Sequence, residues 1–485
     1  MPAKNFVVAI ELGSTMITGI AGQKKSDGSI AVLAVVREDA TQCIRKGVVY
    51  NIDKTVQCIT SIISRLRQQL KSSIKHVYIG VGGQSIHSER NIITKELPDG
   101  MPVTQQLIVE MMDQNRSMEY ADMEILDVEA QEYRADSLLQ TEPVGIPCSR
   151  LEGNFLNILQ SKRHYQKLNK CFEIAGVKLA EIYLAPFALA DAVLTPVEKR
   201  SGCVLVDLGA DTTTVMVYYK NIVRHIAVIP LGGNNITKDI TSLQVEEQEA
   251  EVLKLRYASA YTPQENIDPS LKYDIDRDRK VESSRFIDLI EARVQEIIAN
   301  VWNQVPSDFT DKIQAGIVLT GGGCNLKNID EAFRKHTNMD KVRLAKFVTY
   351  TINATNPDIN AHDGKMNTIL GLLAKGDQNC WAPAEETKPQ DIFSQAETTP
   401  QQGDEPNGVR DPNSLPKGVV LSQYEKEKMA AEKAAAEKAA AEEAARKKAE
   451  EEEAERRRIE EEKKKKPTLG SKVSKWLGSF LTPDE

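Results

Sequence analysis

The chain has 485 residues and a formal net charge of -8 at pH 7. That length exceeds one simple core and predicts two or more domains. The acidic balance argues against general nucleic-acid binding, which usually shows as a basic domain. The seven cysteines are scattered without a CxxC pair, which favours free thiols in a reducing cytosol over a disulfide framework.

The amino-terminal segment "MPAKNFVVAIELG" contains no signal-peptide core. No uninterrupted apolar run approaches the ~20 residues that a membrane-spanning helix needs. The six histidines never fall at metal-ligand spacing, so no zinc site is expected. We therefore expect a soluble protein, unless the tail directs it to a membrane.

Residues 1 to about 380 alternate β-rich runs with helical patterns, which predicts an α/β fold whose helices cover the strands. Two segments there share one pattern: "VVAIELGSTMITGIAG" (7–22) and "VLVDLGADTTTVMVYY" (204–219). Each has an apolar strand, an acid, Leu-Gly, small hydroxylated residues and a second strand. Glu11 aligns with Asp207 and Gly13 with Gly209, which predicts duplicated halves of one architecture.

These two hairpins contain the parts of a phosphate site. Glycine lets a turn backbone approach a phosphate closely, and successive N–H groups in such a turn bind anions. Carboxylates at the strand ends can hold a hydrated Mg²⁺, which keeps most of its waters. The alternative is that the glycines only form turns and each carboxylate caps its own loop.

Two further glycine clusters follow strands. The segment "IPLGGNNITKDI" (229–240) places Gly232 and Gly233 before a helix, a potential phosphate or ribose contact. The segment "AGIVLTGGGCNLKNIDEAF" (315–333) runs from a strand into Gly321, Gly322 and Gly323, then into a helix. Three glycines leave a flat surface for a base or ribose. A merely flexible loop fits poorly after so apolar a strand.

The composition changes sharply after the globular part. Residues 381–421 are rich in Pro, Gln, Thr and Asn, which predicts a disordered linker. Residues 422–466 consist largely of Ala, Glu, Lys and Arg, which favours a solvated helix of up to about 60 Å. A frayed, disordered spacer is the alternative. A coiled coil is the weaker interpretation because no sustained apolar seam is present.

The last segment, "PTLGSKVSKWLGSFLTPDE" (467–485), has an amphipathic pattern. One helical stripe collects its apolar residues, and two lysines lie off the stripe: Leu469, Val473, Trp476, Leu477 and Phe480, with Lys472 and Lys475. Such a helix lies in the membrane interface, and its lysines attract anionic lipids. The alternative, docking on the protein's own head, does not explain so long a linker.

Taken together, these segments resemble the FtsA family of bacterial actin-like cell-division proteins, within the actin/Hsp70/sugar-kinase ATPase superfamily. The resemblance covers roughly residues 5–376 and is carried by "GGNNITKDI" (232–240), "GIVLTGGG" (316–323), "SRFIDLIEARVQEI" (284–297) and "EPVGIPCSRLEGNF" (142–155). It implies a two-lobed actin-like fold with an FtsA-type 1C insert.

The resemblance also implies boundaries. Subdomain 1A would comprise 1–84, 165–200 and 350–380, and the insert 1C would comprise 85–164. Subdomain 2A would comprise 201–240 and 314–349, and subdomain 2B would comprise 241–313.

The resemblance further implies ATP with Mg²⁺ between the lobes. Gly13, Ser14 and Thr15 would contact phosphates from the first lobe, and Gly209 and Thr212 from the second. Glu11 and Asp207 would hold Mg²⁺ through water. Gly232, Gly233 and Asn234 would meet the phosphate or sugar, and the three glycines 321–323 the base or ribose. Glu251 and Lys254, in "EAEVLKLRY" (249–257), would contact ribose and adenine, although such a pair is more often a solvated helix face.

One departure concerns the second hairpin, where the family's consecutive glycines are Ala210 and Asp211. A carboxylate beside anionic phosphates is unfavourable unless a cation intervenes. Asp211 therefore turns away, joins the Mg²⁺ shell, or weakens nucleotide binding. The residue that would orient water for hydrolysis is not identified within 159–170, so slow ATPase activity at most is expected.

The expected partners are those of the family. Arg285 and Arg293, eight residues apart, would receive the acidic carboxyl-terminal tail of FtsZ, although each could be an ordinary surface arginine. Subunits would contact each other through 1C, and anionic inner-membrane lipids would hold the tail. Other division proteins are expected partners, and nucleic acid is not. The expected function is an adaptor that tethers the FtsZ ring to the cytoplasmic face of the membrane at the division site.

Three alternatives remain. A sugar kinase would need a catalytic Asp and a sugar pocket that the sequence does not reveal. A chaperone ATPase would carry a β-rich domain where this chain has a linker. A PilM-like pilus-assembly ATPase shares a 1C-type insert, and the amphipathic tail argues against it.

Overall fold

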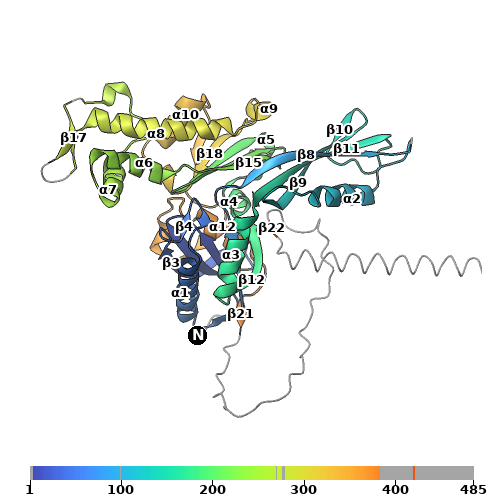
Figure 1. The fold of residues 1–485 in the computed structure, drawn as a ribbon, viewed down its shortest axis with the longest axis horizontal. Helices are drawn as coiled ribbons and strands as arrows, with labels where there is room; N and C mark the ends of the chain where they lie inside the picture. The colour runs from blue at the N-terminus through green and yellow to red at the C-terminus, as the bar shows by residue number, and fades with distance from the viewer. Residues whose placement is uncertain (1–3, 99, 269, 276–278, 383–418, 421–485) are drawn as a thin grey trace, which may run out of the picture. The chain divides into compact units, whose positions relative to one another are not determined.

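Two large β-sheets organise the chain (Figure 1). The computed structural model describes residues 4–98, 100–268, 270–275, 279–382 and 419–420. The first sheet has the order β20-β3-β2-β1-β7-β12-β22, and the second has the order β10-β9-β11-β8-β15-β14-β13-β18-β19. We call the part built on the first sheet lobe one, and the part built on strands β13–β15, β18 and β19 lobe two.

The strands of lobe one and its small two-stranded sheets are β1 (Val7–Leu12), β2 (Met16–Lys24), β3 (Ile30–Asp39), β4 (Ile44–Arg45), β5 (Val48–Val49), β6 (Ser73–Ile74), β7 (His76–Val81), β12 (Lys178–Leu184), β20 (Ile352–Asn353), β21 (Trp381–Ala382) and β22 (Val419–Val420). Its helices are α1 (Ile52–Leu70), α3 (Lys162–Ile174), α4 (Ala185–Val193), α11 (Pro357–Asn360) and α12 (Asn367–Lys375).

Lobe two contains β13 (Cys203–Leu208), β14 (Thr213–Tyr219), β15 (Ile222–Ile229), β16 (Lys272–Asp274), β17 (Lys280–Glu282), β18 (Gly316–Thr320) and β19 (Val342–Leu344). Its helices are α5 (Pro196–Ser201), α6 (Gly233–Ile240), η1 (Thr241–Leu243), α7 (Glu247–Tyr257), η2 (Gln264–Asn266), α8 (Ser283–Asn303), α9 (Ser307–Thr310), η3 (Gly322–Asn325) and α10 (Ile329–Thr337). The insert contains β8 (His87–Glu96), α2 (Gln105–Arg116), β9 (Met123–Ala135), β10 (Leu138–Gln140) and β11 (Arg150–Ser161).

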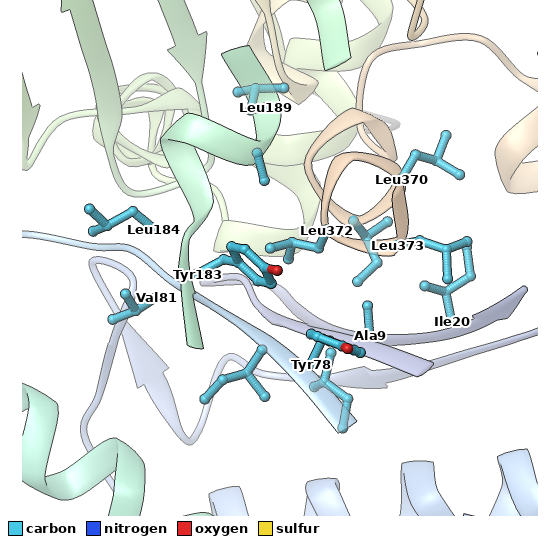
Figure 2. Close-up of a cluster of buried hydrophobic side chains, with 14 of the residues drawn as sticks. Ala9, Ile20, Tyr78, Val81, Tyr183, Leu184, Leu189, Leu370, Leu372 and Leu373 are labelled. Atoms are coloured by element: carbon cyan, nitrogen blue, oxygen red, sulfur yellow. The ribbon is translucent and has the colours of Figure 1, made fainter. Parts of the chain in front are cut away.

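The sheet of lobe one is covered on both faces. A Cβ on Gly19 would lie 2.3 Å from Ile62 of α1, whereas a Cβ on Gly80 would lie 2.5 Å from Leu372 of α12. Figure 2 shows Leu370, Leu372 and Leu373 lying over the strands that carry Ala9 and Tyr78. Glycine is needed at these positions because the helices approach the strands so closely.

The central strands of lobe two are apolar on both faces. In β13, Cys203 and Leu205 join the core that continues into lobe one, while Val204 and Val206 join a second core with Phe286 of α8. Side chains of a strand alternate between the two faces of its sheet. The continuous run "CVLV" therefore forms a strand buried on both sides, as the α/β prediction requires.

The insert extends the sheet of lobe two. Its strand β8 joins β15 through the pair Ala227 and His87. Arg224 of β15, only 2% exposed, donates to Glu132 of β9 at 2.9 Å. Because a buried guanidinium is costly without a partner, this pair fixes the insert against lobe two.

The expected linker at 381–421 begins and ends in strands, which corrects that prediction at four residues. Trp381–Ala382 forms β21 and pairs with β6, and Val419–Val420 forms β22 at the edge strand β12. Val419–Val420 finds backbone partners at the edge of the lobe-one sheet, whereas Trp381–Ala382 forms a separate two-stranded sheet with β6. Residues 383–418, the helix predicted at 422–466 and the tail 467–485 lie outside the described residues. In the described ranges, no helix is both long and apolar enough to cross a membrane.

Candidate nucleotide site at the paired turns

The two predicted hairpins form matching turns. In the first, the N–H of Gly13 donates to the carbonyl of Met16 at 3.0 Å, and in the second the N–H of Gly209 donates to the carbonyl of Thr212 at 2.9 Å. In both turns a Cβ on the glycine would lie 2.8 Å from that same carbonyl. The aligned glycines therefore occupy equivalent positions and are required for the same steric reason.

The turn amides fit an anion. Within the described residues, the main-chain N–H groups of the two central residues of each turn donate to no protein acceptor: Ser14, Thr15, Ala210 and Asp211. Unpaired N–H groups gathered in a tight turn are characteristic of phosphate-binding loops. Unlike these main-chain groups, the Ser14 side chain already has a partner, because its hydroxyl accepts the N–H of Gly47 at 2.9 Å.

The two aligned carboxyl groups are both buried, and the charge of Asp207 acts on Glu11. Glu11 lies on β1 beside Gly80 of the parallel strand β7, and Asp207 lies on β13 beside Thr320 of the parallel strand β18. Burial, and then the negative charge of Asp207, raises the pKa of Glu11 to about 8, although Arg37 lowers it. Burial raises the pKa of Asp207 to about 6. Two adjacent carboxyl groups that resist ionisation suit a divalent cation, which would compensate both charges.

The amino terminus of α6 differs from the expectation. The N–H of Gly233 donates to Gly209 O at 3.0 Å, and the N–H of Asn234 donates to Ala210 O at 2.7 Å. The N–H of Gly232 donates to the Asn235 side chain at 3.0 Å. The amides of Gly233 and Asn234 therefore hold the second turn against the helix, and that of Gly232 caps the helix itself. A phosphate would have to displace protein acceptors to use any of the three. Gly232, Gly233 and Asn234 are supporting residues of the turn in this geometry.

Glu251 and Lys254 lie on α7 and contact α6, with Glu251 still partly exposed to solvent. The Lys254 ammonium is 2.6 Å from a Glu251 carboxylate oxygen, and its side chain is 12% exposed. It also donates to Thr237 Oγ1 at 2.8 Å and to the Gly233 carbonyl at 3.1 Å. The solvated-face alternative is therefore wrong for Lys254. The cluster connects α7 to the helix that supports the second turn.

The glycine triplet packs against Asp207 and Leu208. Gly321 has φ +89°, and a Cβ there would lie 2.3 Å from Asp207 Oδ1. A Cβ on Gly323 would lie 3.0 Å from Leu208, and one on Gly322 would meet the aliphatic stem of Lys365 at 3.4 Å. Close packing thus explains Gly321 and Gly323. The surface at Gly322 is covered by a flexible lysine.

Asp211 turns toward lobe one. Its Oδ2 accepts the main-chain N–H of Lys46 at 3.1 Å, and its Oδ1 accepts Asn234 Nδ2 at 2.8 Å. Its carboxylate thus accepts one hydrogen bond from each lobe. Lys46 and Gly47 form the corner between β4 and β5, and this corner contacts both turns.

A buried glutamine lies beside the first turn's strand. Gln160, 1% exposed, lines a small hollow together with Leu12, Gly80 and Gly82. Its Nε2 donates to the Gly82 carbonyl at 3.2 Å, while its Oε1 has no hydrogen-bond partner. A buried carbonyl oxygen without a donor is unusual and suits a water molecule. Gln160 was not singled out within 159–170 from the sequence, where the available signal was a polar residue at the end of the mostly apolar run "FLNIL".

The two arginines predicted on one helix have different environments. Both lie on α8, where Arg285 is exposed and forms no ion pair with the described residues. Arg293 makes two contacts to Asp239 of α6, at 2.5 and 2.9 Å. Arg293 therefore joins two helices of lobe two, and Arg285 is the cation available to a partner.

Comparisons with known proteins show which family the chain belongs to. A family profile described as "Cell division protein FtsA" matches residues 204–362, and one described as "SHS2 domain inserted in FTSA" matches residues 83–159. The chain is 32% identical over 378 residues to Cell division protein FtsA of Porphyromonas gingivalis, covering 76% of this chain and 78% of that protein. It is 32% identical over 340 residues to the same protein of Neisseria meningitidis, covering 68% and 82%.

A solved structure shares the architecture. The PilM-PilN type IV pilus biogenesis complex matches with a TM-score of 0.52 and 13% identity, over 76% of this chain and 98% of that one. So low an identity supports the fold alone. The sequence relatives decide between the FtsA and PilM interpretations. The chain belongs to the FtsA family of cell-division proteins and has the two-lobed actin-like fold with the FtsA insert.

Proposed function

We propose that the chain is an ATP-binding adaptor that tethers the FtsZ ring to the membrane during cell division. The observation that supports nucleotide binding best is the pair of matching turns, whose central amides donate to no described protein acceptor. Family membership supports the cell-division role. Both turns would donate to the same polyphosphate, so its binding would hold the lobes in one relative position.

The residues have separate roles in this proposal. Gly13 and Gly209 keep the turns tight, and Glu11 and Asp207 hold Mg²⁺ through its waters. Mg²⁺ would supply charge neutralisation for the phosphates. Thr212, the glycines 321–323 and the pair Glu251 and Lys254 complete the sides of the site. Gln160, with its unpaired Oε1, would position a water, and turnover would be slow.

For the FtsZ tail, we propose docking at Arg285. This side chain is exposed on α8 and has no ion-pair partner among the described residues. An acidic peptide would be attracted to such a cation and would bind less well at high salt. Arg293 would contribute by keeping α8 in place against α6.

For self-assembly, we propose the insert as the contact between copies. Leu138 and Leu139 of the edge strand β10 are 59% and 60% exposed. Adjacent exposed leucines on an unpaired strand edge favour association with another chain. Other division proteins would join the resulting assembly, and no role in binding nucleic acid is proposed.

For the membrane, we propose that the tail 467–485 lies in the interface of the cytoplasmic face at the division site. Its stripe of five apolar residues and its lysines support that location. The protein would thus be peripheral.

Calorimetry on the full-length protein tests the nucleotide step. Mg²⁺-ATP should bind wild type, and Asp207→Asn should weaken binding about tenfold or more because one metal-site charge is lost. The control variant Glu247→Gln changes an exposed residue of α7 and should bind Mg²⁺-ATP as wild type does. A folded wild type that gives no binding with Mg²⁺-ATP contradicts the proposal. Sedimentation with anionic vesicles and an FtsZ tail peptide then tests the adaptor role separately.

A further inference from the structure

The contact between Asp211 and Lys46 connects the two lobes across the candidate site. Asp211 belongs to the turn of lobe two, and Lys46 to the corner between β4 and β5 of lobe one. Their hydrogen bond, at 3.1 Å, joins residues 165 positions apart. Contacts of this kind across two bodies determine how far the bodies can separate.

The corner belongs firmly to lobe one. Lys46 O accepts the N–H of Gln84 at 2.8 Å, and Gly47 N–H donates to Ser14 Oγ at 2.9 Å. A Cβ on Gly47 would lie 2.5 Å from Gly83 Cα, so the two backbones are in direct contact. Lys46 and Gly47, with φ 49° and 72°, are the two left-handed residues of a tight hairpin turn, so the Lys46 N–H lies outside the β4–β5 ladder. The corner therefore cannot follow lobe two without breaking several bonds.

Asp211 is held equally firmly by lobe two. Its Oδ1 accepts Asn234 Nδ2 at 2.8 Å, and the Asn234 main-chain N–H donates to Ala210 O at 2.7 Å. Within the described residues, no Lys, Arg or His forms an ion pair with this carboxylate. The donors to the Asp211 carboxylate are therefore neutral groups, a main-chain N–H and a side-chain amide. Such an arrangement resembles an anion held by amide donors.

We propose that Asp211 is an internal competitor for the terminal phosphate of a nucleoside triphosphate. Without nucleotide, its carboxylate takes the Lys46 N–H and keeps the lobes together. The third phosphate of the triphosphate would need the same donor, and two anions cannot share it without strong repulsion. Triphosphate binding therefore displaces Asp211, whereas a diphosphate leaves it in place. Asp211 lowers the affinity for triphosphate relative to diphosphate.

This inference rests on the proposed nucleotide site, but its first half does not need nucleotide. Hydrogen exchange followed by mass spectrometry on the full-length protein, without nucleotide, measures the Lys46 amide directly. Asp211→Gly should speed exchange at Lys46 by about tenfold or more, because the N–H loses its acceptor. Asp211→Asn keeps an acceptor oxygen and should change exchange less. Unchanged exchange in Asp211→Gly overturns the contact, whether or not any nucleotide binds.

The second half is tested by affinity for two probes, ADP and a non-hydrolysable ATP analogue, at one Mg²⁺ concentration. Asp211→Asn and Asp211→Gly should raise affinity for the analogue about tenfold and for ADP less than about threefold. Equal gains for both probes would show a general charge effect and overturn the competition, as would no gain. Stronger binding of Mg²⁺ alone by wild type than by Asp211→Asn would instead assign Asp211 to the metal. Failure of every variant to bind either probe contradicts the proposed nucleotide site and this competition together.

Discussion

Arg293 of α8 donates through two nitrogens to the carboxylate of Asp239 on α6, 54 residues earlier in the chain. Both side chains are about three-quarters buried, at 25% and 24% exposure. The same α6 supports the second turn through Gly233 and Asn234. The helix proposed to receive FtsZ is therefore bonded to the helix beside the candidate nucleotide site.

Because only Arg293 is bonded to Asp239, substitutions at Arg285 and Arg293 should have different effects. Arg285→Glu should weaken binding of an FtsZ tail peptide and flatten its salt dependence, while the melting temperature stays near wild type. Arg293→Glu should cost about 1–3 kcal/mol of stability, since it leaves Asp239 without its partner and adds a like charge. Peptide anisotropy at several salt concentrations, with thermal melts of each variant, measures both effects.

Arg285→Lys is the matched control for peptide binding, because it keeps the charge. If Arg285→Glu binds the peptide as wild type does, the docking surface lies elsewhere. If Arg293→Glu melts normally, the contact with Asp239 contributes little.

The raised pKa of Glu11 predicts that the stability of the fold falls with rising pH. Its pKa rises from 4.5 to about 8 in the folded protein, chiefly through burial. The folded state then holds a proton that the unfolded state releases, so stability falls as the pH rises from about 4.5 to 8. Glu11→Gln mimics the protonated form and should lose less stability over this window. Thermal melts at pH 5, 6, 7 and 8 make the comparison.

Mg²⁺ should reverse this trend. A cation between Glu11 and Asp207 favours the ionised carboxylates, so Mg²⁺ binding should release protons and strengthen as the pH rises toward 8. Calorimetry in two buffers of different ionisation enthalpy detects the protons. Metal binding that is independent of pH between 6 and 8 would place Mg²⁺ away from Glu11.

Two neighbouring glycines give a matched stability test. Gly321→Ala should destabilise the protein by about 2 kcal/mol or more, because a side chain is strained at its positive φ and would meet Asp207. Gly322→Ala should be mild, since its Cβ would meet only the movable stem of Lys365. Urea unfolding of both variants measures the difference. Equal losses would contradict the packing explanation.

The parts of the site that depend on local patterns could be predicted from the sequence. The strand, acid, glycine and hydroxyl order of each hairpin fixed the matching of Gly13 with Gly209, and the structure confirms it. Arg285 and Arg293, eight residues apart, were likewise expected on one helix, and α8 contains both. The pairing of Asp211 with Lys46 was not, because it joins residues 165 apart. Nor could the pattern show that the amides of Gly233 and Asn234 are used by the second turn.

The linker illustrates the same limit. Its composition predicted disorder, but backbone groups at Val419–Val420 pair with Ile182 and Tyr183 on the edge of β12. Figure 2 shows Tyr183 of this strand among the side chains of the first-lobe core. A free sheet edge accepts a short strand whatever the surrounding composition.

The tail provides the last prediction. Trp476 lies in the middle of the apolar stripe of 467–485, four residues before Phe480. Trp476→Glu removes the burial of the indole and adds a charge that is costly to desolvate, together several kcal/mol by transfer values of roughly 1.5–3 kcal/mol per buried side chain. A single amphipathic helix binds only moderately, so this loss should release the protein from anionic vesicles. Trp476→Phe keeps an aromatic ring at the interface and should still sediment with them.

Nucleotide binding and the melting temperature should stay unchanged in both variants, because the substitution lies outside the two lobes. Equal sedimentation of wild type and Trp476→Glu would show that the tail is not the anchor, and failure of wild type to sediment would favour a tail docked on the protein itself.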